Sequence, residues 1–161
     1  MDFADLDKTD KALVERTSLF LKKRASDVSG VSAGLRTNSG REFFGLCIDT
    51  KTSTVGVCAE FSAIGNMLSN GEREVRTIVA VADKGNGRHA ILPPCGKCRD
   101  FIRAFGNPFV ILQMGSTMSK AKKVKLSELS PFPWDQADWA GAINRDLTAS
   151  GMPLNRRPHR T

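Results

Sequence analysis

Three cysteines and one glutamate have the types and spacing that can support chemistry in this sequence. Cys95 and Cys98 form a C-x-x-C pair directly after two prolines, and Cys58 lies two residues before Glu60. Three protein ligands and one open position are the pattern of a catalytic zinc site, and a nearby carboxylate can move protons without binding the metal. A C-x-x-C pair alone is also found in redox proteins, so a thiol redox pair stays open as the alternative.

Both groups of thiols fall where the sequence predicts the start of a helix. Apolar residues at helical spacing indicate a helix over residues 57–70, with Cys58 in its first turn. Pro93 and Pro94 prevent an earlier start of the next helix, which is predicted over residues 98–105. The free N–H groups and partial positive charge of a helix N-terminus favour thiolate over thiol. We therefore expect these thiols to ionise readily.

The other elements predict an α/β sheet covered by helices. A period near 3.6 indicates a first helix over residues 9–24, and two strands over 31–37 and 41–48 read as a hairpin. Apolar runs predict buried strands at residues 75–82 and 109–114. An edge strand at residues 122–126 and a last helix at 135–149 complete the expected order, which is that of an α/β domain.

The composition indicates one globular domain. The chain has 161 residues, of which 40% are hydrophobic and 25% charged, and this excludes a disordered tail or a fibre. No apolar run approaches the roughly 18 residues of a membrane span, and the first residues are acidic, unlike a signal peptide. We therefore expect a cytoplasmic protein without a membrane partner, in a compartment where stable disulfides are disfavoured.

The net charge of +7 raises the question of a nucleic-acid partner. Much of the excess lies in clusters at residues 22–24, 120–125 and 156–160, and such clusters are typical of solvated faces. The chain has no Tyr, and aromatic residues do not alternate with basic ones as they do in a base-stacking surface. These features argue against nucleic acid as the partner.

The sequence resembles the small zinc-dependent cytidine deaminases that use three Cys ligands. The segments GVCAE, which ends at Glu60, and PCGKCR, which ends at Arg99, resemble the family motifs G-V-C-A-E and P-C-G-x-C-R. The resemblance runs from about residue 9 to residue 132. It implies a three-layer α/β/α fold with a central mixed five-stranded sheet, a deaminase-like domain at residues 1–134, and a C-terminal helix and basic tail at 135–161.

The resemblance also implies a reaction and a cofactor. One zinc ion per subunit would be bound by Cys58, Cys95 and Cys98, with Glu60 as general acid and base. The reaction would replace the 4-amino group of a cytosine nucleoside or nucleoside analogue by oxygen, with release of ammonia. Three thiolates leave such a site with a net negative charge, so we expect Arg99 and backbone N–H groups to donate to sulfur. The family further implies a homotetramer.

Several positions depart from the nucleoside branch of the family. Its N-x-E segment, which holds the ribose, is here Cys47 and Asp49, while Phe61 and Asp100 replace its usual Arg and Gln. The sequence is closer to the blasticidin-S deaminase branch, so cytidine, deoxycytidine and blasticidin-S-like analogues are all candidate substrates. The candidate substrate-binding residues are Cys47, Asp49, Ala59, Pro94, Phe132 and Trp134.

Three other functions remain open at this point. The chain could deaminate another aminated heterocycle, or a base in a single-stranded polynucleotide, for which the first ligand would more typically be His. It could also be a non-catalytic zinc-binding module, although Glu60 would then have no role beside the metal ligands.

Overall fold

The structure is a computed structural model that describes residues 6–115 and 120–133. The chain divides into two compact units, Met1–Leu129 and Ser130–Thr161. The second unit is described only at residues 130–133, so Trp134 and the helix expected at residues 135–149 lie outside the described residues. None of the described helices is long and apolar enough to cross a membrane.

A single mixed sheet forms the middle layer of the first unit. The strands follow the order β2-β1-β3-β5-β6, and β4 pairs with β3 beside this path. Among the described strands, only β3 and β5 pair in parallel, and the other pairs are antiparallel. The strands are β1 (Val31–Thr37), β2 (Glu42–Leu46), β3 (Val75–Asp83), β4 (His89–Leu92), β5 (Phe109–Gln113) and β6 (Ala121–Lys125).

The sheet of the described residues has six strands, so the expected count of five is corrected. The additional strand is β4, which pairs with the last part of β3 from Ala80 to Asp83, whereas β5 pairs with β3 at Thr77 and Ile78. Four residues are too few to show a sequence period, which is why β4 could not be recognised beforehand. The strand leads directly into the two prolines before Cys95.

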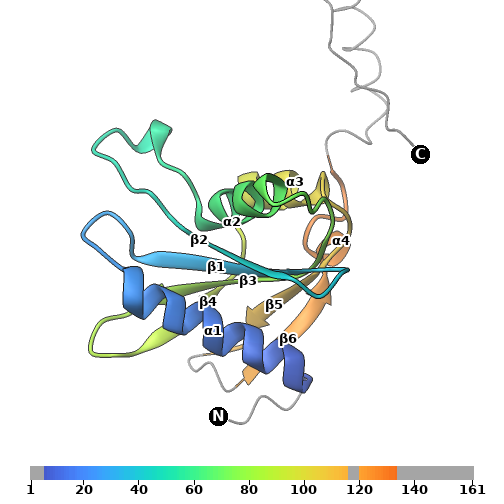
Figure 1. Ribbon diagram of the computed structural model, residues 1–161, viewed down its shortest axis with the longest axis horizontal. Helices are drawn as coiled ribbons and strands as arrows, with labels where there is room; N and C mark the ends of the chain where they lie inside the picture. Colours follow the sequence, from blue (N-terminus) through green and yellow to red (C-terminus); the bar gives the residue numbers. More distant parts are fainter. Residues whose placement is uncertain (1–5, 116–119, 134–161) are drawn as a thin grey trace, which may run out of the picture. The chain divides into compact units, whose positions relative to one another are not determined.

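Helices cover both faces of the sheet, and this confirms the three-layer α/β/α fold. Figure 1 shows α1 on one face and α2 and α3 together on the other. All predicted elements within the described residues are present, with ends that shift by at most two residues. The helices are α1 (Lys8–Arg24), α2 (Ala59–Ser69), α3 (Gly96–Arg103), the short α4 (Leu126–Leu129) and the 3₁₀ helix η1 (Ser53–Val55).

Two hydrophobic clusters lie between the layers, and β3 contributes to both. Ile78 packs in the cluster under α2 and α3, whereas Val79 and Val81 pack in the cluster under α1. Alternate side chains of a strand point to opposite faces, so a strand covered on both sides is apolar throughout. This arrangement explains the continuous apolar run of β3 and confirms its predicted burial.

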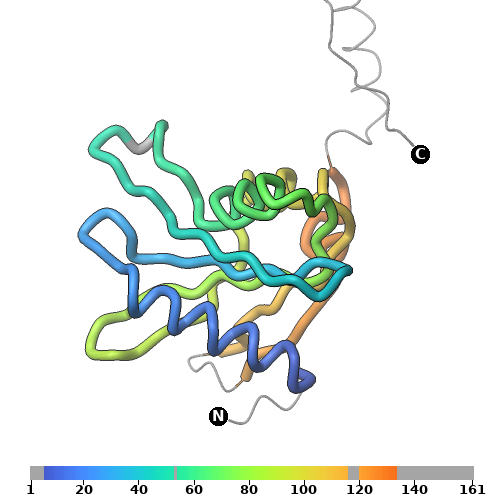
Figure 2. The backbone as a smooth tube through the Cα atoms, viewed as in Figure 1, coloured from blue at the N-terminus to red at the C-terminus, as the bar shows by residue number. Residues whose placement is uncertain are grey.

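Three connections of the first unit lie at one end of the sheet. Figure 2 shows the chain between α1 and β1, between β2 and α2, and between β3 and β4 at the same end, opposite the β1–β2 turn. The β3–β4 turn contains Gly85, Asn86 and Gly87, all with positive φ. Reciprocal backbone hydrogen bonds between Ile48 and Val57 join the two limbs of the β2–α2 connection, and the N–H of Cys47 donates to the carbonyl oxygen of Val31 at the start of β1.

Candidate active site

Two helix starts bring the three predicted ligands together. Cys58 is the N-cap of α2, Cys95 is the N-cap of α3, and Cys98 lies in the first turn of α3. Their sulfur atoms all lie within 4.8 Å of one another, and none of the three forms a disulfide. Tetrahedral zinc with bonds near 2.3 Å places its sulfur ligands about 3.8 Å apart. The three cysteines therefore fit a zinc ion with one position left open.

The protonation of the thiols depends on burial as well as on the helix starts. Burial raises the pKa of Cys58, and burial together with the negative charge of Glu60 raises the pKa of Cys98 strongly. Burial acts in the same sense on Cys95, but the backbone N–H of Cys98 and the neighbouring thiols outweigh it, so the pKa of Cys95 is lowered. Hydrogen bonding at the helix start therefore lowers the pKa of Cys95, whereas burial dominates at Cys58 and Cys98.

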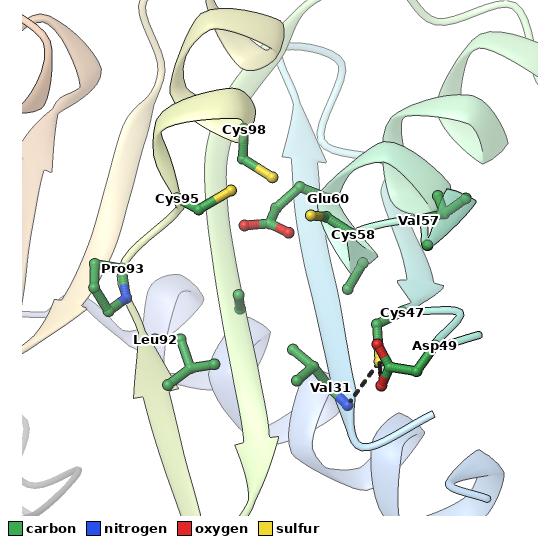
Figure 3. A pocket seen from close by; sticks show the side chains of 13 residues that line it. Val31, Cys47, Asp49, Val57, Cys58, Glu60, Leu92, Pro93, Cys95 and Cys98 are labelled. Carbon is green, nitrogen blue, oxygen red and sulfur yellow. Dashed lines mark hydrogen bonds between the residues drawn. The ribbon is translucent and has the colours of Figure 1, made fainter. Parts of the chain in front are cut away.

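Glu60 lies beside the thiols in the first turn of α2. Its side chain is 7% exposed, and Figure 3 shows the carboxylate directed among the three sulfur atoms. The negative charge of Glu60 contributes to the raised pKa values of both Cys58 and Cys98, which agrees with this close approach. A carboxylate in this position can exchange protons with a molecule at the open side of the metal site.

A pocket of about 330 Å³ adjoins the thiols. Its walls come from β1, the β2–α2 connection, β3, β4 and the starts of α2 and α3. Of the residues predicted to bind substrate, Cys47, Asp49 and Ala59 line this pocket. Pro94 is absent from its described lining, and Phe132 belongs to the second unit.

Sequence reasoning did not find several residues that line the pocket. Val31, Ala80, Leu92 and Pro93 all contribute to its walls. The first three are ordinary apolar strand residues with no local motif, so no sequence signal marks them. Pro93 stands directly before the recognised motif, and it lines the pocket where Pro94 does not.

Cys47 and Asp49 form a hydrogen-bonded pair at the end of the pocket opposite the thiols (Figure 3). The backbone N–H of Val31 donates to the Cys47 sulfur at 3.3 Å, and the Cys47 thiol donates to Asp49 Oδ2 at 3.6 Å. Burial, with a contribution from the charge of Asp49, raises the pKa of Cys47. Cys47 is therefore a protonated donor that is buried at the pocket wall.

Arg99 was expected to donate to the cysteine sulfur atoms, but its described hydrogen bonds go to backbone carbonyl oxygens. Its Nε donates to the carbonyl oxygen of Pro94 at 2.9 Å, and its Nη1 donates to the carbonyl oxygen of Leu129, also at 2.9 Å. The expected donation to sulfur is thus replaced by donation to the backbone directly before Cys95. Arg99 fixes the entry to α3 and ties it to the end of α4.

An aromatic stack joins the two helices that carry the ligands. The rings of Phe61 on α2 and Phe101 on α3 lie parallel with centroids 3.7 Å apart, and Lys97 Nζ lies 4.9 Å from the Phe61 centroid. Stacked rings contribute packing beyond their buried area. Phe61, which departs from the family motif, therefore helps to hold α2 and α3 against each other.

Comparison with known proteins agrees with this geometry. The family model described as the zinc-binding region of cytidine and deoxycytidylate deaminases matches residues 8–114. A blasticidin-S deaminase of Bacillus cereus is 34% identical over 109 residues, which cover 65% of this chain and 76% of that protein. A cytidine deaminase of Halalkalibacterium halodurans is 29% identical over 108 residues, which cover 67% of this chain and 79% of that protein.

Solved structures share the fold. The crystal structure of a cytidine deaminase from Mycobacterium leprae has a TM-score of 0.63 at 21% identity and covers 78% of this chain and 100% of its own. That of a cytidine deaminase from Bacillus anthracis has a TM-score of 0.67 at 18% identity, with 86% and 98% covered. Because the sequence identities to these two structures are low, the comparison shows a shared fold and nothing more specific.

Proposed function

The chain belongs to the cytidine and deoxycytidylate deaminase family of zinc hydrolases, and we propose that it deaminates a free cytosine nucleoside or a cytosine nucleoside analogue. The observation that carries this proposal is the convergence of Cys58, Cys95, Cys98 and Glu60 at one end of a pocket. The reaction replaces the 4-amino group of the ring by oxygen, which gives the uracil form and ammonia.

Cys58, Cys95 and Cys98 would hold the zinc ion, which would supply the Lewis acidity that favours ionisation of water near neutral pH. Glu60 carries the protons: it accepts one from the attacking water and delivers it to ring N3, while oxygen adds to C4. It then carries the second water proton to the amino group, so that the C4–N bond breaks and ammonia leaves. The N3 proton stays on the product, and the carboxylate of Glu60 returns to its starting state.

The size of the pocket supports a small substrate. A volume of about 330 Å³ lies at the lower end of the range for small-molecule sites, roughly 300–1,000 Å³. A nucleoside is of this scale, with the base ring next to Glu60 and the sugar toward Cys47 and Asp49. At the position of Cys47 the nucleoside branch of the family has an Asn, whose amide offers two donors and an acceptor, whereas the thiol offers one donor. This difference supports a nucleoside analogue as substrate at least as strongly as it supports cytidine.

We also propose a domain boundary, a cellular compartment and an oligomeric state for the enzyme. Residues 1–134 form the catalytic domain, the protein is cytoplasmic, and it is a homotetramer in which Phe132 and Trp134 contribute to substrate binding. The similarity to the family supports the assembly, and the exposure of Phe132, at 95%, agrees with a ring that is covered by substrate or by another subunit. Light scattering after gel filtration measures the mass of the assembly directly.

The decisive experiment measures ammonia release and zinc content together. We expect the protein to release ammonia from at least one of cytidine, deoxycytidine and blasticidin S, with one zinc ion per chain. Glu60→Gln should retain the zinc and lose about 10²–10⁴-fold in kcat, because the amide cannot carry the proton. Glu15→Gln, an exposed change on α1 across the sheet, is the matched control. A zinc-loaded protein that releases no ammonia from any of these compounds would refute the proposal.

A further inference from the structure

Two strands share one side of β3. Because β1 pairs with β3 along nearly its full length, β4 and β5 both lie along the other side. There β5 pairs with Thr77 and Ile78, and β4 takes its place from Ala80 to Asp83. The described strands form no ladder between β4 and β5, so the outer edge of β4 has no strand partner. A buried N–H group on this edge needs an acceptor from elsewhere.

The side-chain amide of Gln113, at the end of β5, supplies such an acceptor. Its Oε1 accepts the N–H of Ile91 in β4 at 3.0 Å, and its Nε2 donates to the carbonyl oxygen of Gly115 at 2.8 Å. The second bond fixes the orientation of the amide, because only its N–H groups can donate to a carbonyl oxygen. Ile91 is buried, so loss of Gln113 would leave a buried N–H unsatisfied.

The two residues after Ile91 form one wall of the pocket. Leu92 ends β4 and Pro93 follows it, and both line the pocket (Figure 3). Leu92 is paired with Ala80, which lines the pocket from β3. A shift of β4 relative to β3 would therefore change the shape of the cavity in which a substrate binds.

A separate contact holds the chain directly after this wall. Arg99 donates to the carbonyl oxygen of Pro94 at 2.9 Å, and Cys95 follows immediately as the N-cap of α3. The wall thus lies between two anchors, with Gln113 on the β4 side and Arg99 on the α3 side. Loss of the Gln113 contact should displace the wall and leave the metal ligand in place, because the second anchor remains.

We propose that Gln113 is a positioning residue for substrate binding: its amide fixes the outer edge of β4 and thereby the pocket wall formed by Leu92 and Pro93. The inference deepens the proposed deaminase function and rests on it. Without the amide, arrangements in which β4 has left its binding position become more populated, and the apparent affinity for substrate falls with the competent fraction. Loss of one hydrogen bond changes such an equilibrium by about tenfold, so KM rises by up to about that factor.

Three variants of Gln113 test this role. Gln113→Leu removes both hydrogen bonds at similar volume, and Gln113→Asn keeps an amide that is too short to reach Ile91. Both should raise KM for the nucleoside that the wild type deaminates by about tenfold, with kcat and zinc content near the wild-type values. Gln113→Glu retains an oxygen that accepts the N–H of Ile91, and it should restore KM to within about threefold of the wild type.

Asn107→Leu is the matched control at the other end of β5. The Asn107 side chain also accepts a backbone N–H, that of Ser127, at 3.0 Å, but it lies outside the described pocket lining. This variant loses a contact of the same kind and should keep the KM of the wild type. Thermal unfolding compares the stability of all variants. An equal rise of KM in Gln113→Leu and Asn107→Leu would show a general loss of stability and overturn the positioning role.

Hydrogen exchange and binding without turnover keep this inference distinct from the proposed function. In mass spectrometry of peptides that contain β4, Gln113→Leu should exchange about tenfold faster than the wild type, and Gln113→Glu should not. Calorimetry on zinc-loaded Glu60→Gln protein measures the binding of cytidine and blasticidin S with and without Gln113→Leu. If the wild type releases no ammonia but Gln113→Leu still weakens binding, the proposed reaction fails and the inference stands. If ammonia is released but Gln113→Leu leaves KM unchanged, the inference is overturned and the reaction stands.

Discussion

A single methyl group added at Gly45 should disturb both the fold and the chemistry. Gly45 of β2 lies directly under α2, and a Cβ at this position would stand 2.2 Å from the backbone nitrogen of Ala63 and 2.6 Å from the carbonyl carbon of Ser62. Ordinary contacts of a Cβ begin at 3.4 Å. Because these neighbours are backbone atoms of a helix, they can recede only if the whole helix moves, by about 1 Å if the strand stays in place.

The size of the effect follows from what α2 carries. Overpacking of a close-packed interior costs about 1–3 kcal/mol, so Gly45→Ala should lower the free energy of unfolding by that amount. The displaced helix also carries Cys58 at its N-cap and Glu60 in its first turn. A misplacement of about 1 Å in catalytic groups can reduce the rate roughly 100-fold, and we expect a loss of that order in kcat/KM.

Gly65→Ala provides a matched control in the same helix. Its added Cβ meets no atom within 4 Å, and Ala is favoured over Gly in a helix by about 1 kcal/mol, so this variant should be more stable than the wild type and equally active. Urea unfolding of zinc-loaded protein and ammonia release measure the two effects. If Gly45→Ala matched the wild type in both measurements, the close approach of β2 would not determine where α2 lies.

The remaining predictions concern the metal and the opposite face of the sheet. Cys95→Ala should lose zinc and stability together, because metal binding and folding share the start of α3; elemental analysis and thermal unfolding check this, and a stable variant that retains zinc would contradict the ligand assignment. Chelation of zinc from the wild type should lower Tm, whereas the same treatment of Cys95→Ala should change little. Asp10→Asn should lower the free energy of unfolding in urea by about 3 kcal/mol, because the fully buried Asp10 carboxylate accepts from Arg36 and Lys123, which then keep the longer ion pairs with Glu42 at 3.9 Å and Asp7 at 3.2 Å. A loss below about 1 kcal/mol would show that this network contributes little to stability.

Functional residues that lie in short sequence motifs could be recognised from the sequence. The thiols occur in two short motifs, each at a helix start, and helix starts are marked by prolines, caps and the first apolar residues of a period. The helices α1, α2 and α3 and the longer strands could be predicted for the same reason, since each carries its own periodicity. The short strand β4 has no period to detect and was missed.

The roles of Cys47 and Arg99 depend on contacts between segments that are distant in sequence. Cys47 meets the N–H of Val31 because β1 pairs with β2, whereas its contact with Asp49 is local. The sequence predicted Arg99 as a donor to sulfur. Its bond to the carbonyl oxygen of Leu129 could not be predicted, because it depends on the packing of α4 beside α3.

The sequence by itself determined the chemistry of this protein, because Cys58, Glu60, Cys95 and Cys98 carry their identity in residue type and short spacing. The tertiary structure alone decided the shape and the charge of the pocket. Its walls come from β1, β3, β4 and the β2–α2 connection, which meet only when the sheet is assembled in register. Spacing along the chain describes neighbours within a few residues, whereas the preference for one substrate over another depends on which distant side chains the fold brings to the same cavity.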